Sequence, residues 1–382
     1  MNQPFYYQKI DELPTTTNVE ANWRKKSATS VGYYILRNIA ILAGLIGVTL
    51  SIYSITFNST IQTTSLEIDN RTKYSILDND SISNLFDKFK ITYNKSYDTI
   101  EEESLRYNYF NHFLSLVDER NGNDSYAIHG ITKFADLSDE EFRQNFLGYK
   151  STTNMNNNAK RAYINDYDGS ETYVNWADVY TTAVKDQGYC GSCWAFSATE
   201  QIESDAIRVG LLTTSDTLSP EQIVQCDSVD DGCNGGNTAT AFEYVITAGG
   251  IESEVQYPYT SYYDVTGTCN SNSTNYGVTV DEYYMISDES DMISHIFSTG
   301  PISICLDAST WSSYVSGIIT TCGMEVDHCV QAVGMNLAEG YWIVRNSWGT
   351  EWGNEGYIFL ESGSNMCNIA YDPKYVDVSI VA

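Results

Sequence analysis

The chain has 382 residues, of which 42% are hydrophobic and 13% aromatic, so it can build more than one globular unit and is neither disordered nor fibrous. Its net charge of −29 is concentrated in residues 170–382, which carry −25 and contain only four basic side chains. So few cations cannot neutralise a phosphate backbone, which excludes a nucleic-acid partner.

All nine cysteines lie between Cys190 and Cys367. This clustering favours disulfide bonds in an oxidising compartment over a reduced cytosol. The acidity of the same region has two interpretations, which are stability in an acidic compartment and a means of staying soluble.

The first predicted element is the uncharged apolar run at 38–57, which has about the length that spans a bilayer as a helix. Basic residues are enriched before it, so the positive-inside rule directs residues 1–37 to the cytosol. We therefore expect a signal anchor and a type II, single-pass membrane precursor. A cleaved signal peptide is the alternative, although its leader would be long and no clear cleavage site follows.

Residues 58–80 form the predicted luminal linker. Six N-x-S/T sequons lie beyond the apolar run, on the side that the anchor places in the lumen, and they predict a glycoprotein. They begin at Asn58, Asn70, Asn79, Asn94, Asn123 and Asn272.

Residues 81–150 have a helical pattern, with apolar side chains three or four positions apart in 82–121. These side chains are Leu85, Phe86, Phe89, Leu105, Tyr109, Phe113 and Leu116. Taken alone, the pattern predicts a small helical domain.

Within this region, two sets of residues keep a characteristic spacing. The first set is Glu102, Arg106, Phe110, Val117 and Asn121, and the second is Gly130, Phe134 and Asp136. Together they resemble the ERFNIN-type propeptides of cathepsin L-like proteases, from which Phe113, Val117 and Thr132 depart. The resemblance implies an inhibitory domain that lays a strand through the protease cleft in reverse until acid pH loosens it. An ordinary amphipathic helical pair is the alternative.

Residues 151–169 are polar and rich in asparagine, without apolar periodicity. We expect an exposed activation linker here, in which cleavage separates the inhibitory domain from residues 170–382.

The run KDQGYCGSCWAF at 185–196 is the most informative in the chain. Ser192 is a favourable N-cap and helical periodicity continues to Gly210, so we expect Cys193 in the first turn of a helix. The unpaired N–H groups of that turn and the helix dipole favour a thiolate. Cys193 is therefore the predicted nucleophile for acyl transfer.

Residues 170–382 contain two histidines, and His328 is the one in a suitable run, VDHCVQAVGM, 135 residues after Cys193. The apolar stretch after it indicates a buried strand. Asn346 follows in YWIVRNSWGTEWGNEGY. These separated matches resemble the papain-like cysteine proteases. By this resemblance Asn346 orients the His328 ring, Trp348 shields their hydrogen bond from water, and Gln187 joins the Cys193 N–H in an oxyanion hole.

For residues 170–382 the resemblance implies a papain-like α+β fold, with a helical lobe carrying Cys193, a β-barrel-like lobe carrying His328, and a cleft between them. It implies a monomeric cysteine endopeptidase that acts on proteins and peptides, is inhibited by its own propeptide, and uses no metal or organic cofactor. No insertion resembling an exopeptidase's blocking loop is visible between Cys190 and Cys269. We expect an acidic endolysosomal or vacuolar location, or secretion after processing.

Three other interpretations stay open. The C-x-x-C spacing from Cys190 to Cys193 is typical of thioredoxin-like redox sites, but that reading leaves His328 and Asn346 without a role. A zinc site would need a second closely spaced pair of ligands, which the sequence lacks. A catalytically silent family member that serves as a binding protein is the third, and the joint presence of the catalytic residues argues against it.

The disulfide pattern is also taken from the resemblance, because six cysteines alone do not fix their connectivity. It pairs Cys190 with Cys233, Cys226 with Cys269, and Cys322 with Cys367. On this assignment Cys193, Cys305 and Cys329 are unpaired, the last two as buried small hydrophobic residues.

Substrate-binding residues are assigned in the same way. Gly235 and Gly236 would let an extended peptide pair with the backbone, although a plain tight turn also needs glycine. The other residues assigned are Asn237, Thr238, Cys305, Val326, Asp327, Trp348 and Asp372. We expect Asp372 at the floor of the pocket for the residue two before the scissile bond, where its charge would admit a basic side chain besides Leu or Phe.

Overall fold

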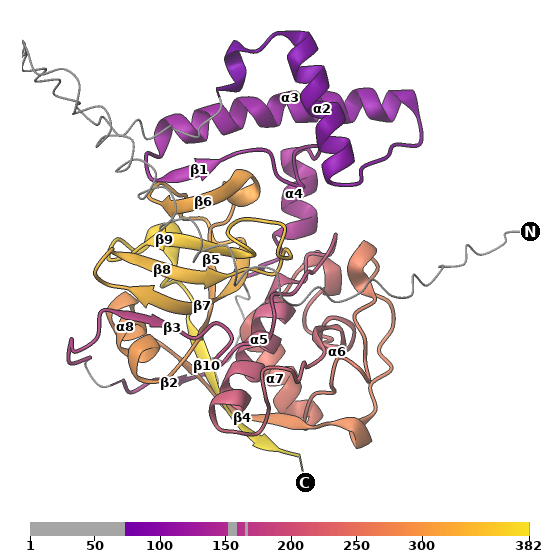
Figure 1. Ribbon diagram of the computed structural model, residues 1–382. Helices are drawn as coiled ribbons and strands as arrows, with labels where there is room; N and C mark the ends of the chain where they lie inside the picture. Colours follow the sequence, from indigo (N-terminus) through magenta and orange to yellow (C-terminus); the bar gives the residue numbers. More distant parts are fainter. Residues whose placement is uncertain (1–72, 152–158, 165–166, 382) are drawn as a thin grey trace, which may run out of the picture. The chain divides into compact units, whose positions relative to one another are not determined.

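The structure is a computed structural model that describes residues 73–151, 159–164 and 167–381 (Figure 1). Among these residues, no helix is both long and apolar enough to cross a bilayer. The anchor predicted at 38–57 lies outside the described residues.

Two crossing helices, α2 (Asn79–Thr92) and α3 (Ile100–Asn123), form the core of the N-terminal domain, a name that we use for residues 73–150 (Figure 1). Both begin at a side chain that accepts a backbone N–H of the first turn, Asp78 for α2 and Thr99 for α3. Phe110 of α3 is fully buried against two phenylalanines of α2, with ring centroids 5.3 Å apart in both pairs. This aromatic packing holds the two helices together.

After α3, the chain joins the N-terminal domain to the rest of the protein. Strand β1 (Ala127–His129) pairs antiparallel with β6 (Tyr314–Ile319). Helix α4 (Asp139–Phe146) follows and begins with a capping box between Ser138 and Glu141. It directs the chain between the strands on one side and α5 on the other (Figure 1).

The helical lobe consists of α5 (Cys193–Arg208), α6 (Pro220–Cys226) and α7 (Thr238–Ala248). Helix α5 is buried at every position up to Ala206, because α6, α7 and the sheet all pack on it. Short 3-10 turns lie at Tyr74–Ile76, Gly232–Asn234, Ser261–Tyr263, Ser273–Asn275, Trp311–Ser313 and Met366–Asn368.

The strands of the described residues form one connected sheet in the order β1-β6-β9-β8-β7-β5-β10-β4-β2, with β3 beside β7. Besides β1 and β6, the strands are β2 (Lys160–Arg161), β3 (Tyr173–Asn175), β4 (Val278–Met285), β5 (Ile302–Leu306), β7 (His328–Asn336), β8 (Tyr341–Arg345), β9 (Tyr357–Glu361) and β10 (Lys374–Ile380). Helix α8 (Glu289–Ser298) lies outside the helical lobe's set of α5, α6 and α7. Strand β7 is buried throughout because both α5 and α8 pack against it. The predicted α+β fold with a helical lobe and a β lobe is confirmed.

Four disulfide bonds connect these elements, and three have the predicted pairing. The fourth, Cys305–Cys329, corrects the prediction that both cysteines are free. The two residues lie directly opposite each other on the antiparallel strands β5 and β7, with Cα atoms 4.0 Å apart, so their side chains meet on one face of the sheet. Cys193 is then the one free cysteine of the described chain.

Candidate active site

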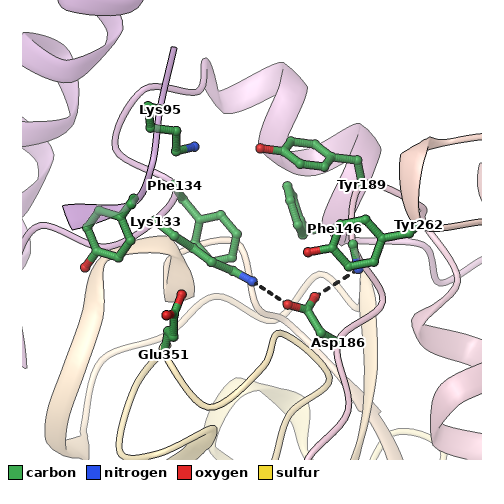
Figure 2. A pocket seen from close by; sticks show the side chains of 10 residues that line it. Lys95, Lys133, Phe134, Phe146, Asp186, Tyr189, Tyr262 and Glu351 are labelled. Carbon is green, nitrogen blue, oxygen red and sulfur yellow. Dashed lines mark hydrogen bonds and ion pairs between the residues drawn. The ribbon is translucent and has the colours of Figure 1, made fainter. Parts of the chain in front are cut away.

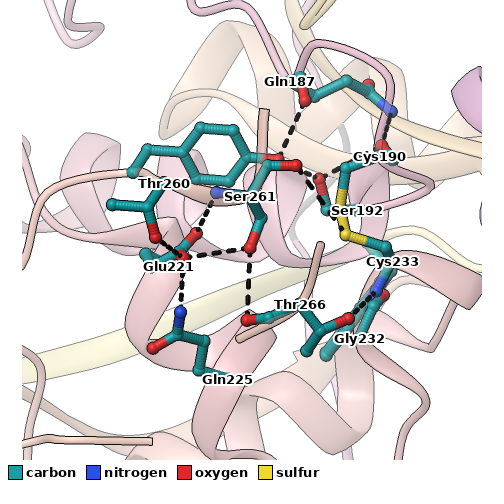
Figure 3. The surroundings of a disulfide bond; sticks show 12 residues. Gln187, Cys190, Ser192, Glu221, Gln225, Gly232, Cys233, Thr260, Ser261 and Thr266 are labelled. Carbon is teal, nitrogen blue, oxygen red and sulfur yellow. Dashed lines mark hydrogen bonds between the residues drawn. A yellow bond between two sulfur atoms is a disulfide. The ribbon is translucent and has the colours of Figure 1, made fainter. Parts of the chain in front are cut away.

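Cys193 is the first residue of α5 and is fully buried. Ser192 occupies the N-cap position, but its hydroxyl contacts Cys190 O at 3.3 Å and the Tyr259 hydroxyl at 2.9 Å (Figure 3). The prediction that its side chain caps the helix was therefore wrong, because its backbone is not in the extended conformation of a capping residue. The N-terminal turn of α5 still surrounds the thiol.

The lobes meet where α5 crosses β7. The Ser197 hydroxyl of α5 donates to Val330 O of β7 at 2.7 Å. The backbone N–H of Cys329 also points at the Cys193 sulfur, which brings the thiol beside the residue that follows His328.

His328 is held from the opposite side by Asn346. Its Nε2 lies 2.8 Å from Asn346 Oδ1, at the point where β7 begins and its neighbour β8 has just ended. Within the described residues, Nδ1 of His328 has no hydrogen-bond partner. The ring is thus oriented by one nitrogen while the other stays available.

An aromatic group covers this hydrogen bond. The Trp348 ring centroid lies 4.8 Å from that of His328, and Trp348 is fully buried. Trp311 and Trp352 pack around it. The predicted exclusion of water from the histidine–asparagine pair is consistent with this packing.

Gln187 is fixed in place by Ser347, a residue that sequence reasoning missed. The Ser347 hydroxyl donates to Gln187 Oε1 at 2.7 Å, which turns Nε2 toward Cys190 O at 2.8 Å and Phe146 O at 3.4 Å. The position next to Asn346 in the sequence was the available signal for Ser347. Gln187 Nε2 therefore already faces a carbonyl oxygen from the N-terminal domain.

The cleft between the lobes holds residues 147–150, which we call the cleft segment. Gly236 N–H donates to Gly148 O and Lys150 N–H donates to Gly236 O, both at 2.8 Å, while Tyr149 N–H donates to Asp327 O at 2.9 Å. The pairing of Tyr149 with Gly236 is parallel. A further N–H, that of Gly148, points at the Cys193 sulfur at 3.3 Å.

The close passage of the cleft segment depends on glycines. A Cβ on Gly148 would lie 1.9 Å from Gly191 O, which no side chain can accommodate. A Cβ on Gly235 would lie 2.6 Å from Gly148 O, and one on Gly236 would lie 2.6 Å from the Trp194 ring. The Gly235–Gly236 pair thus permits backbone approach, besides forming a turn in which Gly235 has a φ of 113°.

The thiol and the imidazole are both fully buried in the precursor, and burial dominates their ionisation. Burial raises the pKa of Cys193 to about 12, although the N–H groups of Cys329 and Gly148 oppose the shift. Burial likewise lowers the pKa of His328 to about 4, although the hydrogen bond that its ring donates to Asn346 opposes the shift. Between these values both groups are neutral, and a neutral thiol is a poor nucleophile.

Several residues predicted to bind substrate lie along the cleft segment. Asn237 Nδ2 donates to Lys150 O at 3.3 Å, and Tyr149 packs on the same apolar cluster as Val326 and Cys305. Cys305 is present there as half of a disulfide and not as a free thiol.

Asp372 has a partner that sequence reasoning missed. Its carboxylate forms an ion pair with Lys374, whose Nζ also lies 3.4 Å from Thr238 Oγ1. The two opposite charges only two residues apart in the sequence were the available signal for the ion pair, whereas the contact with Thr238 depends on the folded position of β10 beside the start of α7.

Most residues of the first propeptide motif hold the N-terminal domain together. Arg106 donates to Glu141 at 2.7 Å and to Asp136 O at 3.1 Å, and it lies 3.9 Å from Glu102. Phe110 and Val117 are fully buried. Asn121 brackets the backbone of His129, accepting from its N–H at 2.8 Å and donating to its carbonyl at 2.9 Å. Asp136 binds Lys95 and Tyr97.

Polar contacts join the N-terminal domain to the β lobe beyond the cleft. Arg120 donates to the hydroxyls of Ser312 and Ser313, and Thr320 N–H donates to Asp124 at 2.7 Å. Phe134 packs edge-on against Trp348 with centroids 5.3 Å apart.

A cavity of about 170 Å³ lies where the N-terminal domain meets the cleft (Figure 2). Its lining comes from both parts of the chain, and Lys133 reaches across it to Asp186 at 3.0 Å. Phe146 and Tyr189 cover the side toward α4 and Gln187. This part of the cleft is left incompletely filled by the N-terminal domain.

A free thiol that the chain's own N-terminal domain keeps neutral in a two-lobed cleft defines a cysteine protease zymogen. Residues 171–376 match the papain family cysteine proteases, and residues 86–142 match the cathepsin propeptide inhibitor domain (I29). The chain belongs to the papain family, with an inhibitory propeptide.

Individual relatives agree with this assignment. Cysteine proteinase B of Leishmania mexicana is 38% identical over 301 residues, which cover 76% of this chain and 68% of that protein. Cysteine proteinase 1 of Dictyostelium discoideum is 35% identical over 324 residues, covering 78% and 92%. The solved structure of digestive procathepsin L2 from Tenebrio molitor has a TM-score of 0.70 at 29% identity, covering 77% of this chain and 99% of that one.

The clash at Gly148 gives a first prediction. The substitution Gly148→Ala should displace the cleft segment, because its Cβ would meet backbone that cannot move aside. Overpacking of this kind usually costs about 1–3 kcal/mol, so the uncleaved precursor should hydrolyse a fluorogenic peptide at pH 7 about tenfold faster or more.

Gly122→Ala is the matched control, since a Cβ on that glycine of α3 meets nothing within 4 Å. Its precursor should be as inactive as the wild type. Equal inhibition of the Gly148→Ala and Gly122→Ala precursors would contradict this account of the cleft.

Proposed function

We propose that the chain is the precursor of a cysteine endopeptidase in which Cys193 is the nucleophile and His328 is the general acid and base. The observation that carries the proposal is the hydrogen bond from His328 Nε2 to Asn346, which leaves Nδ1 without a partner in the described residues. The N–H of the next residue, Cys329, points at the free Cys193 thiol. The family assignment supports it independently.

Departure of the cleft segment would begin the chemistry. It removes the burial that keeps Cys193 and His328 neutral, and the N-terminus of α5 then favours a thiolate beside an imidazolium. The thiolate attacks the scissile carbonyl, and the oxyanion is held by Gln187 Nε2 and the Cys193 N–H. His328 gives its proton to the leaving amine, then takes one from the water that hydrolyses the acyl-enzyme.

The role of Gln187 is supported by its contact in the precursor. Its Nε2 faces the carbonyl oxygen of Phe146, the residue that ends α4 and leads into the cleft segment. A donor that faces a carbonyl oxygen of the inhibitory segment is positioned to donate a hydrogen bond to the carbonyl oxygen of a substrate bound in the same cleft.

A catalytically silent binding protein is the alternative function, and thiol labelling separates the two. The processed wild-type protein should react with an epoxide-type thiol inhibitor and hydrolyse fluorogenic peptides at acid pH, whereas Cys193→Ala should do neither. A processed, folded wild-type protein that neither labels nor hydrolyses would support the silent alternative.

We also propose that the enzyme works in an acidic endolysosomal or vacuolar compartment. The support is a set of buried or partly buried carboxyl groups whose pKa burial raises to about 7, namely Glu200, Asp227, Glu254 and Asp327. Below about pH 7 the folded chain keeps protons that the unfolded chain releases. The stabilisation is therefore complete below the ordinary pKa values of 3.8 and 4.5 and is lost as the pH rises through about 7.

Glu200 provides the test of this pH dependence. It is fully buried on α5, and neither carboxylate oxygen accepts a hydrogen bond within the described residues, although Arg345 lies 3.6 Å away. In a Cys193→Ala precursor, which cannot digest itself, Tm should be higher at pH 5 than at pH 7.5. Glu200→Gln should narrow that difference by about 2–4 °C, which corresponds to about 1 kcal/mol in a domain of this size.

Glu339→Gln, at an exposed position, is the control and should leave the difference unchanged. A parent protein that melts higher at pH 7.5 than at pH 5 would refute the argument.

For the whole precursor we propose the organisation expected from the sequence. Residues 81–150 are the inhibitor, 151–169 the activation linker and 170–382 the protease, and the two family matches fall within these bounds. The uncharged run at 38–57 supports a type II anchor that leaves the protease in the lumen. The full-length Cys193→Ala precursor should therefore stay with membranes in alkaline carbonate, and its release into the supernatant would exclude the anchor.

A further inference from the structure

Tyr149 lies in the part of the cleft beside Tyr371 and Asp372, which we call the Tyr149 pocket. A buried lysine adjoins it. Lys374 is the first residue of β10, and its side chain is 1% exposed. It is one of only four basic residues in 170–382. A cation at this depth needs a specific partner, because burying an unpaired charge is costly.

The partner is Asp372, two residues earlier, whose side chain is 11% exposed. Besides the ion pair, Lys374 Nζ lies 3.4 Å from both Asp372 O and Thr238 Oγ1. Thr238 begins α7 immediately after Asn237, which contacts the cleft segment. The pair therefore lies between β10 and the start of α7, next to the residue that contacts the cleft segment.

Tyr149 shows what this pocket accepts. Its ring meets that of Tyr371 edge-on at 6.1 Å, and its hydroxyl is close enough to Asp372 to be affected by that charge. The part of the pocket nearest the charges thus holds a neutral aromatic side chain with a polar tip, supplied by the protein itself.

We propose that Lys374 is the specificity-determining residue of this pocket: by neutralising Asp372 it makes the pocket select neutral aromatic and aliphatic side chains and reject arginine and lysine. This inference rests on the proposed peptidase function and adds the substrate class to it. It replaces the expectation that Asp372 admits a basic residue, because that expectation left Lys374 out.

The physical reason is the balance of charge at the pocket floor. A lone carboxylate there would bind an arginine side chain through charge-assisted, bidentate hydrogen bonds. The Lys374 ammonium already forms an ion pair with that carboxylate. An incoming guanidinium would therefore face a like charge and would have to break the buried ion pair. Each of these effects costs more free energy than burying a neutral ring.

The test compares kcat/KM of the processed enzyme on fluorogenic peptides that carry Tyr, Leu, Arg or Glu two residues before the scissile bond and are otherwise identical. The wild type should prefer Tyr and Leu to Arg by about tenfold or more. Lys374→Met keeps the length of the side chain but frees Asp372, so the Arg/Leu ratio should rise about tenfold or more. Lys374→Met/Asp372→Asn should lose that gain.

Asp372→Asn alone tests the same pair from the other side and does not depend on how well Lys374→Met folds. It leaves an unpaired ammonium, so the Glu/Leu ratio should rise by a similar factor. Lys185→Met is the matched control, because it removes a mostly buried lysine from its ion pair with Glu203, outside this pocket. Its ratios should equal those of the wild type.

Two kinds of failure are distinguishable. A wild type that cleaves the Arg peptide as well as the Leu peptide, or an Arg/Leu ratio unchanged by Lys374→Met, overturns the role of Lys374 while peptidase activity stands. If the processed wild type hydrolyses none of the peptides and has no titratable active-site thiol, the proposed function is overturned as well.

Discussion

The passage of residues 147–150 across Cys193 is the contact on which the precursor state depends. Four backbone N–H groups tie this segment to both lobes, among them those of Gly148 on the thiol and of Tyr149 on Asp327 O. The segment is short, so its position is set by α4 before it, and α4 is held in turn by Arg106 of α3. A small helical domain is thereby sufficient to close a cleft between two lobes.

The same burial gives a physical reason for inhibition by the propeptide and for the change that activation requires. A neutral thiol and a neutral imidazole are the forms that low dielectric favours, and both are the wrong forms for attack. The orienting groups are already in place, because Asn346 and Trp348 fix His328 while Ser347 fixes Gln187. Activation therefore requires exposure and ionisation more than rearrangement. Burial acts in the same way on acids such as Glu200: it favours the neutral form, so the fold loses stability as these groups ionise.

Sequence reasoning succeeded where the determinants are local or recur at fixed spacing. It placed Cys193 at the start of a helix and His328 at the start of a buried strand, because periodicity and motif spacing carry that information. Three of the four disulfides were paired correctly through the family resemblance. The α+β fold followed from the resemblance that those motifs established.

It failed where the outcome depends on strand register or on the choice between competing partners. The Cys305–Cys329 bond exists because β5 and β7 pair in one register, which single-sequence patterns do not specify. Serine is a residue type that often caps helices, but the Ser192 hydroxyl contacts Tyr259 instead of the backbone N–H groups of α5. Lys374 stands only two residues after Asp372 in the sequence, but its burial against that carboxylate beside Thr238 is decided by the folded chain.

The central claim is that the cleft segment keeps Cys193 a neutral thiol, and the rate of alkylation of Cys193 by iodoacetamide tests it most directly. At pH 7, where the intact precursor is compared with the processed enzyme, the account predicts negligible alkylation before processing and rapid alkylation afterwards. Equal rates in the two forms would contradict it.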